Sequence, residues 1–170
     1  MNLLNHPAFQ SLVLPLLLSV LGVALALRVG GPHRAALGAS LGLLVAWSVF
    51  PGYVWPASAR AQQVLWIALA GAVVAVLLVW RTPRVAAPRG RGIVMAGLLT
   101  VACLALAAAA ALGGSLLLAQ LAMMVATASA VPGLWSWWRP ASGVVVSAVS
   151  LLPMALACLV IATALPAAPW

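Results

Sequence analysis

The sequence contains no aspartate and no glutamate, and its eight basic side chains are all arginine, so lysine is absent as well. A chain without carboxylate side chains cannot form a carboxylate acid–base pair, a Ser-His-Asp triad, a site for hard cations or a carboxylate proton relay. No serine stands in a G-x-S-x-G context either. We therefore predict that the protein is not an independent enzyme.

Cysteine and histidine are scarce, with two of each in the chain. Cys103 and Cys158 lie in different apolar segments, and neither belongs to a C-x-x-C or metal-ligand pattern. His6 and His33 flank the first apolar segment, which would place them on opposite faces of a membrane, too far apart to share a metal. The sequence predicts no metal site and no cofactor, and no nucleic acid is expected as a partner.

Hydrophobic residues dominate the composition, at 66% of the chain against 5% charged residues. In ordinary globular domains about a quarter of the residues are charged, and a soluble fold of this composition would have too little polar surface to cover its core. Because lipid leaves every backbone polar group to be satisfied within its own segment, apolar spans are expected to be helical. The predicted fold is an all-α, polytopic transmembrane bundle, with residues 1–170 forming a single domain.

Six apolar segments have lengths near the ~20 residues that cross a bilayer as a helix. They cover residues 9–27, 35–50, 62–80, 93–112, 115–131 and 142–165. The fourth and fifth are separated only by a turn at Gly113 and Gly114. A single helix from Ile93 to Val131 would be about 58 Å long, roughly twice the thickness of a hydrocarbon core, so two spans are expected there.

The arginines are distributed unevenly over the connections between these segments. Seven of the eight lie in the first, third and fifth connections, and only Arg60 lies in an even-numbered one. The positive-inside bias then places the odd connections in the cytoplasm and both termini outside. We expect a multi-pass protein of the plasma (inner) membrane of a bacterium.

Half of the arginines occupy one short stretch, RTPRVAAPRGRG at residues 81–92. With no acid in the chain to pair with them, Arg81, Arg84, Arg89 and Arg91 are expected to anchor this loop on the phosphates of anionic lipid headgroups, each gaining about 1 kcal/mol before screening. Docking of an acidic partner on the same loop is the alternative.

Few polar residues lie inside the apolar segments. Gln120, Thr127 and Ser48 are the candidates for lining a solute pathway, although hydrogen bonding between helices is the commoner role of such groups. Gly38 and Gly42 form a G-x-x-x-G motif that permits close approach of two helix backbones. Packing within the chain and contact with a partner helix are both open for this motif.

Two aromatic segments resemble each other, FPGYVWPAS at 50–58 and VPGLWSWWRPAS at 131–142. Aromatic belts at membrane interfaces explain such residues, and a 3+3 inverted repeat is a second interpretation. Two functions follow as hypotheses. The first is a non-enzymatic accessory or structural subunit of a membrane assembly, whose partners are other transmembrane helices. The second is a small permease or channel for a neutral or anionic solute.

Overall fold

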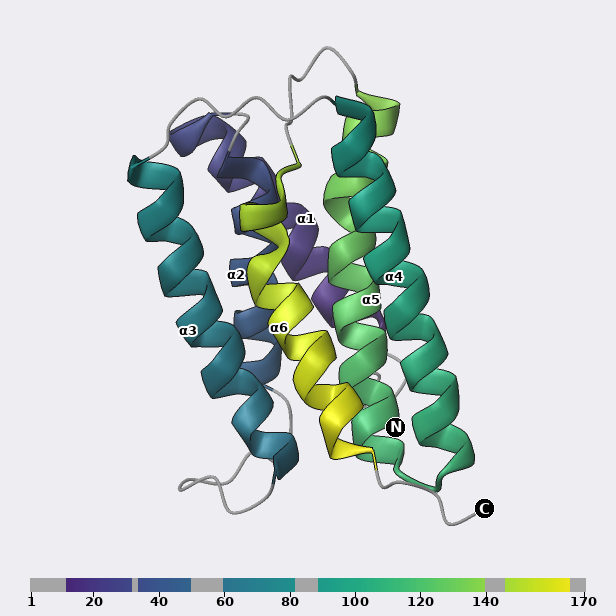
Figure 1. The fold of residues 1–170 in the computed structure, drawn as a ribbon. Helices are drawn as coiled ribbons and strands as arrows, with labels where there is room; N and C mark the ends of the chain where they lie inside the picture. Colours follow the sequence, from purple (N-terminus) through teal and green to yellow (C-terminus); the bar gives the residue numbers. More distant parts are fainter. Residues whose placement is uncertain (1–11, 32–33, 50–59, 82–88, 140–145, 166–170) are drawn as a thin grey trace, which may run out of the picture.

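In the computed structural model the described residues, 12–31, 34–49, 60–81, 89–139 and 146–165, form an all-α structure with six helices. The helices are α1 (Leu14–Gly30), α2 (Ala35–Val49), α3 (Arg60–Arg81), α4 (Arg89–Leu112), α5 (Leu116–Trp138) and α6 (Ala148–Ala164). They lie alongside one another and alternate in direction, so that the C-terminal ends of α1, α3 and α5 lie at the same end of the bundle (Figure 1).

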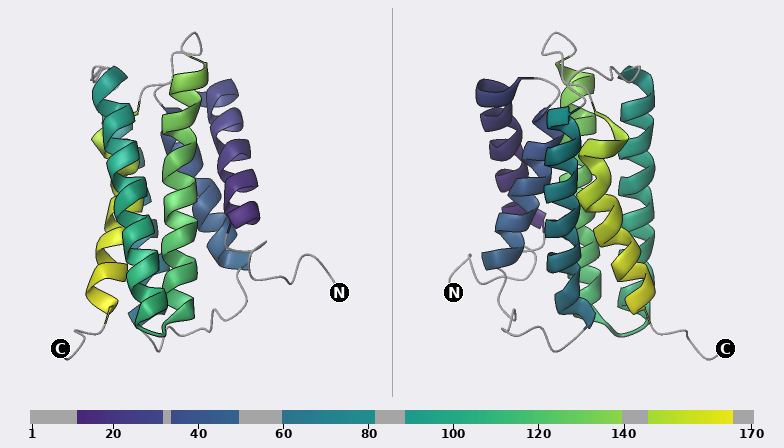
Figure 2. Two further views of the ribbon diagram at one scale, coloured as in Figure 1. Left: turned by 90° about the vertical axis from the view of Figure 1, so that its right-hand side faces the viewer. Right: turned by 60° about the vertical axis from the view of Figure 1, so that its left-hand side comes forward.

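Three pairs of helices make the most extensive contacts: α1 with α2, α4 with α5, and α3 with α6. The first two pairs are hairpins of consecutive helices, whereas α3 and α6 are far apart in the sequence. α5 contacts α1, α2 and α6 in addition to α4, and the two side views show it between the α1–α2 hairpin and α4 (Figure 2). The two hairpins are therefore joined through α5 and through the α3–α6 pair.

Three helices are long and apolar enough to cross a membrane, through residues Gln63–Arg81, Gly90–Leu112 and Leu116–Trp138. α1, α2 and α6 are also apolar, but they have only 17, 15 and 17 residues. At 1.5 Å per residue these three helices are about 23–26 Å long, slightly less than a hydrocarbon core of ~30 Å.

The fifth helix differs most from its expected bounds. It continues past Val131 and through Pro132 to Trp138, whereas the Pro-Gly pair predicted an end there. Proline removes one hydrogen bond from the ladder but leaves the later turns intact, and neighbouring helices can cover the freed carbonyl in an apolar helix. Pro132 and Gly133 are indeed buried inside the bundle. Pro153 likewise lies within α6. Residues 9–11 of the first expected span lie outside the described residues.

The turn between α4 and α5 falls at Gly113 and Gly114, where the sequence analysis expected it. Ser115 donates its N–H to the carbonyl of Ala110 at 2.9 Å, and Gly114 donates to Ala111 at 3.1 Å. These two bonds form a Schellman motif, in which the residue after the helix adopts a left-handed conformation. Gly114 has a φ of 77°, which glycine adopts without the steric cost of a Cβ.

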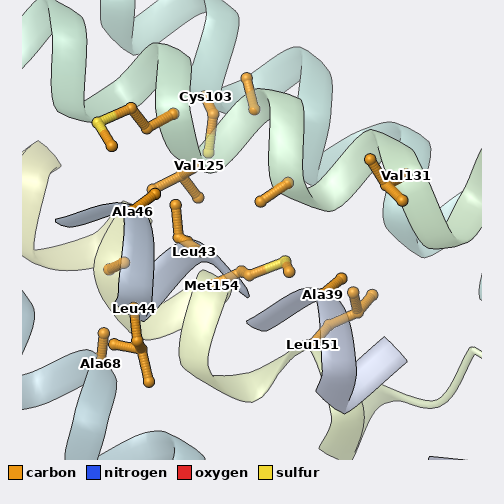
Figure 3. Packing of buried hydrophobic residues seen from close by; sticks show 14 of the residues in the cluster. Ala39, Leu43, Leu44, Ala46, Ala68, Cys103, Val125, Val131, Leu151 and Met154 are labelled. Atoms are coloured by element: carbon orange, nitrogen blue, oxygen red, sulfur yellow. The ribbon is translucent and has the colours of Figure 1, made fainter. Parts of the chain in front are cut away.

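The core lies where α2, α5 and α6 meet, around Leu43, Val125 and Met154, which are fully buried (Figure 3). α5 is the most enclosed of the long helices, with 61% of its apolar window buried against 28% for α3 and 22% for α4. The outer faces of α3 and α4 carry large exposed side chains such as Leu77, Leu98 and Val101. A surface with this much exposed aliphatic area is typical of contact with lipid or with other helices.

Candidate functional site

One end of the bundle collects the arginines. The described arginines Arg28, Arg34, Arg81, Arg91 and Arg139 lie at or near helix ends that share this end, and α3 begins with Arg60 at the opposite end (Figure 1). Of the loop predicted to bind lipid headgroups, Arg81 and Arg91 are exposed. Arg89 is the first residue of α4, and Arg84 lies outside the described residues. We call this the arginine end of the bundle.

The G-x-x-x-G motif packs within the chain, against α1. A Cβ placed on Gly38 would overlap the carbonyl oxygen of Gly22, and one placed on Gly22 would overlap the carbonyl oxygen of Gly38. A Cβ on Gly42 would overlap the carbonyl oxygen of Leu18 and lie 2.8 Å from the Cα of Ser19. The backbones of α1 and α2 therefore touch at both glycines, which decides the alternative left open by the sequence.

This close approach leaves a groove on the surface of the bundle. Its volume is about 490 Å³. Glycines of both α1 and α2 belong to its lining. Larger apolar side chains form its walls, namely Leu18, Leu21, Leu25 and Val29 of α1, Leu37, Leu41 and Val45 of α2, and Val76, Val79 and Trp80 of α3. We refer to it as the α1–α3 groove.

Arg34 is the charged residue that lines this groove, and it lies at the arginine end. Its aliphatic stem packs on Gly30, since a Cβ on Gly30 would lie 2.5 Å from Cδ of Arg34. Its Nε is buried and has no hydrogen-bond partner among the residues that the structure describes. A buried charged donor without a partner is costly, and the chain has no carboxylate side chain to supply one.

Four polar side chains inside the bundle form hydrogen bonds between pairs of helices. The hydroxyl groups of Thr100 (α4) and Ser129 (α5) are 3.0 Å apart. Ser40 of α2 donates to the carbonyl of Ser150 in α6 at 3.3 Å, and Ser19 of α1 donates to the carbonyl of Ala39 in α2 at 3.3 Å. Each bond joins a different pair of helices, so these groups do not converge on one cavity.

Of the three residues predicted to line a pathway, Gln120 and Thr127 lie on α5 and Ser48 lies on α2. Ser48 is exposed near the end of α2 and donates to its own helix at the carbonyl of Val45, 2.8 Å away. Thr127 is half-buried on α5 and donates to the carbonyl of Met123 at 2.8 Å. Gln120 is half-buried two turns earlier on the same helix. None of the three is among the described residues that line the α1–α3 groove.

The sequence analysis missed the residues of α1 that build this groove. Gly22, Ala26 and Gly30 are spaced four residues apart, so they form one face of a helix with small side chains. This pattern is as clear in the sequence as the one formed by Gly38 and Gly42. Packing these two faces against each other would have predicted the contact between α1 and α2. Nothing in the sequence, however, marks Arg34 as the arginine that would lie in a groove.

Two further pairs of residues become neighbours only in the structure. Cys103 of α4 and Cys158 of α6, which the sequence analysis treated separately, are neighbours where α4 contacts α6. Arg139 lies 5.9 Å above the ring centre of Trp135, a distance at which a guanidinium is attracted to the ring face. In the part of the chain that the structure describes, no group of three or more metal-ligating side chains occurs.

Comparisons with known proteins give no relative for this chain. No family model, no curated protein and no solved structure matches it. Any functional conclusion therefore depends on the contacts described above.

Proposed function

We propose that the chain is a non-enzymatic accessory or structural subunit of an assembly in the bacterial plasma membrane. The observation that carries the proposal is the use of the internal polar groups. Thr100, Ser129 and Ser40 join pairs of helices, and the outer faces of α3 and α4 are apolar. A bundle of this kind has much surface for neighbouring helices and little polar lining for a solute.

The proposal includes six membrane crossings with both termini outside. The arginine end supports it, because the described helix ends that carry Arg28, Arg34, Arg81, Arg91 and Arg139 share it and cytoplasmic loops are enriched in arginine. The three shorter helices are compatible with crossing. Arginine side chains at their ends can extend to the headgroups, and the bilayer can thin locally at modest cost.

The subunit role is tested by extracting the protein from its native membrane in mild detergent and measuring the mass and composition of the particle. We expect a larger complex that contains other membrane chains at stoichiometric ratio. Recovery of this chain alone, as a monomer or a homodimer, would contradict the proposal.

The topology is tested separately with reporter fusions after Gly90 and after Trp170. The proposal expects the reporter at Gly90 in the cytoplasm and the reporter at Trp170 outside. A fusion after Gly114, in the turn between α4 and α5, serves as a control and should agree with the one at Trp170. Reporters at Gly90 and Trp170 on the same side would exclude six crossings.

The second hypothesis, a permease for a neutral or anionic solute, stays a prediction. The pairing of α1 with α2 and of α4 with α5 has the form that a 3+3 repeat would require. The contact of α1 with α5, however, has no equally extensive counterpart between α4 and α2 among the described residues. Solute flux into liposomes that contain the purified chain would favour this hypothesis over the first.

A further inference from the structure

The α1–α3 groove has the polarity profile of a single lipid molecule. Between Leu18 and Val29 its lining is aliphatic or glycine, and at its far end it reaches Trp80 and Arg34. From Leu18 to Gly30 the groove follows about 18 Å of α1 at 1.5 Å per residue, which is close to the ~15 Å depth of one hydrocarbon leaflet. An acyl chain lying along it would place its headgroup at the arginine end.

The charge at that end selects the kind of headgroup. Arg34 lines the groove at this end, and an arginine guanidinium binds phosphate oxygens in a planar, two-pronged geometry. Arg34 directly precedes α2, so the positive end of that helix dipole adds to the attraction for an anion. Trp80 is mostly exposed at the same end, where tryptophan rings commonly lie at headgroup depth.

We infer that the α1–α3 groove is a binding site for one anionic phospholipid. One of its acyl chains lies along Gly22, Gly38 and Gly42 between walls of leucine and valine, and its phosphate accepts hydrogen bonds from Arg34. A polar or charged solute would meet no partner along the apolar length of the groove. An apolar partner helix would cover the walls but would offer no anion to Arg34 at the end of the groove. The inference rests on the membrane location in the proposed function and not on the subunit role.

The test uses the full chain in liposomes that contain phosphatidylglycerol and phosphatidylcholine, followed by release into mild detergent and native mass spectrometry of the retained lipid. We expect one retained phosphatidylglycerol per chain. Arg34→Gln should lower its apparent affinity on the order of tenfold, since a hydrogen bond to a charged group contributes about 1.5–3 kcal/mol. Arg28→Gln is the matched control, because Arg28 is exposed at the same end but does not line the groove.

A second variant tests the acyl-chain part of the site. Val45→Trp enlarges a half-exposed wall residue and should reduce retention of either lipid without changing the thermal midpoint of unfolding. Leu98→Trp, on the exposed face of α4 away from the groove, is its control and should behave as wild type.

Three results would overturn the inference. They are equal retention of phosphatidylglycerol and phosphatidylcholine, equal effects of Arg34→Gln and Arg28→Gln, or cross-linking of a protein partner from Val45 in native membranes. These outcomes are independent of the subunit test. A chain recovered alone that still retains phosphatidylglycerol would contradict only the subunit role, and a stoichiometric complex without lipid preference would contradict only the lipid site.

Discussion

The α1–α2 and α4–α5 hairpins have different interfaces. Both helix pairs are antiparallel, and each turn contains a glycine with positive φ, Gly31 at 82° and Gly114 at 77°. In the first hairpin the two backbones touch at Gly22 and Gly38. In the second, Gly133 faces Ala96, with 3.1 Å from a Cβ built on the glycine to the Cβ of the alanine.

The two interfaces differ in the size of the side chains between the helices, and a groove lies on the surface beside the glycine interface. Where glycine meets glycine, the backbones of the two helices touch, and the α1–α3 groove lies along this contact. Where alanine and Cys103 lie in the interface, their own side chains are buried and fill it. The glycine contact is thus bordered by a groove that another molecule can occupy, whereas buried alanine side chains fill the interface between α4 and α5.

The largest expected effect comes from adding one methyl group to the glycine contact. Gly38→Ala should destabilise the bundle by about 1–3 kcal/mol, because the new Cβ meets backbone that cannot rotate away. Gly97→Ala on α4 is the control. A Cβ there has no atom within 4 Å, so this change should be neutral or slightly stabilising through helix propensity. Unfolding in mixed micelles of increasing SDS content, followed by circular dichroism, measures both. Equal destabilisation would show that the two hairpins do not differ in this way.

The turn of the second hairpin should be the next most sensitive position. Gly114→Ala should cost about 1–2 kcal/mol, because a Cβ in the left-handed conformation collides with the following carbonyl. At Gly113 an added Cβ would lie 3.4 Å from the carbonyl oxygen of Ala109, which is ordinary contact. Gly113→Ala is therefore expected to change the unfolding midpoint little in the same assay. The reverse order of the two effects would contradict the Schellman geometry.

The smallest expected effect concerns the hydroxyl groups that cross each hairpin. Thr100→Val removes the 3.0 Å bond to Ser129 and should cost about 0.6 kcal/mol, the average for such bonds in a membrane bundle. Ser19→Ala removes a longer bond of 3.3 Å, and we expect a smaller loss because glycine contacts hold that hairpin. A double-mutant cycle of Thr100→Val with Ser129→Ala isolates the pairwise energy. A larger loss from Ser19→Ala would mean that α1–α2 depends on its hydrogen bond and not on its glycines.

The all-α class and most of the helix positions followed from the sequence. Apolar runs predict helices, because the apolar character of a segment and the hydrogen-bonding demand of its backbone are both local properties. The C-terminal end of α5 could not be predicted from the sequence, since a Pro-Gly pair such as Pro132 and Gly133 usually interrupts a helix. Their continuation inside a helix depends on burial against neighbours that are distant in the chain.

The sequence contains the residues of the candidate site but does not predict that they come together. The sequence contains the small-residue faces of both partners, Gly22–Ala26–Gly30 and Gly38–Gly42, yet a motif that allows close approach does not say which helix approaches. It also contains arginines and no acid, which predicted binding to phosphate in the long third connection. That loop stays a prediction, and the structure adds Arg34, whose stem packs on Gly30 and which lines the α1–α3 groove.

The sequence by itself determined that the segments are apolar and helical and that arginine is the only side chain with a permanent charge. It also determined that seven of the eight arginines lie in every second connection between these segments. These depend on each segment's own chemistry and on counting. Only the tertiary structure decided that α3 pairs with α6 and that the hydrogen-bonding hydroxyl groups belong to separate helix pairs. It also decided that a groove ending at Arg34 lies along the contact between α1 and α2. The reason is that small and apolar residues are nearly uniform along this chain, so many pairings of its helices have similar patterns. Which pairing occurs depends on how whole helix surfaces fit together.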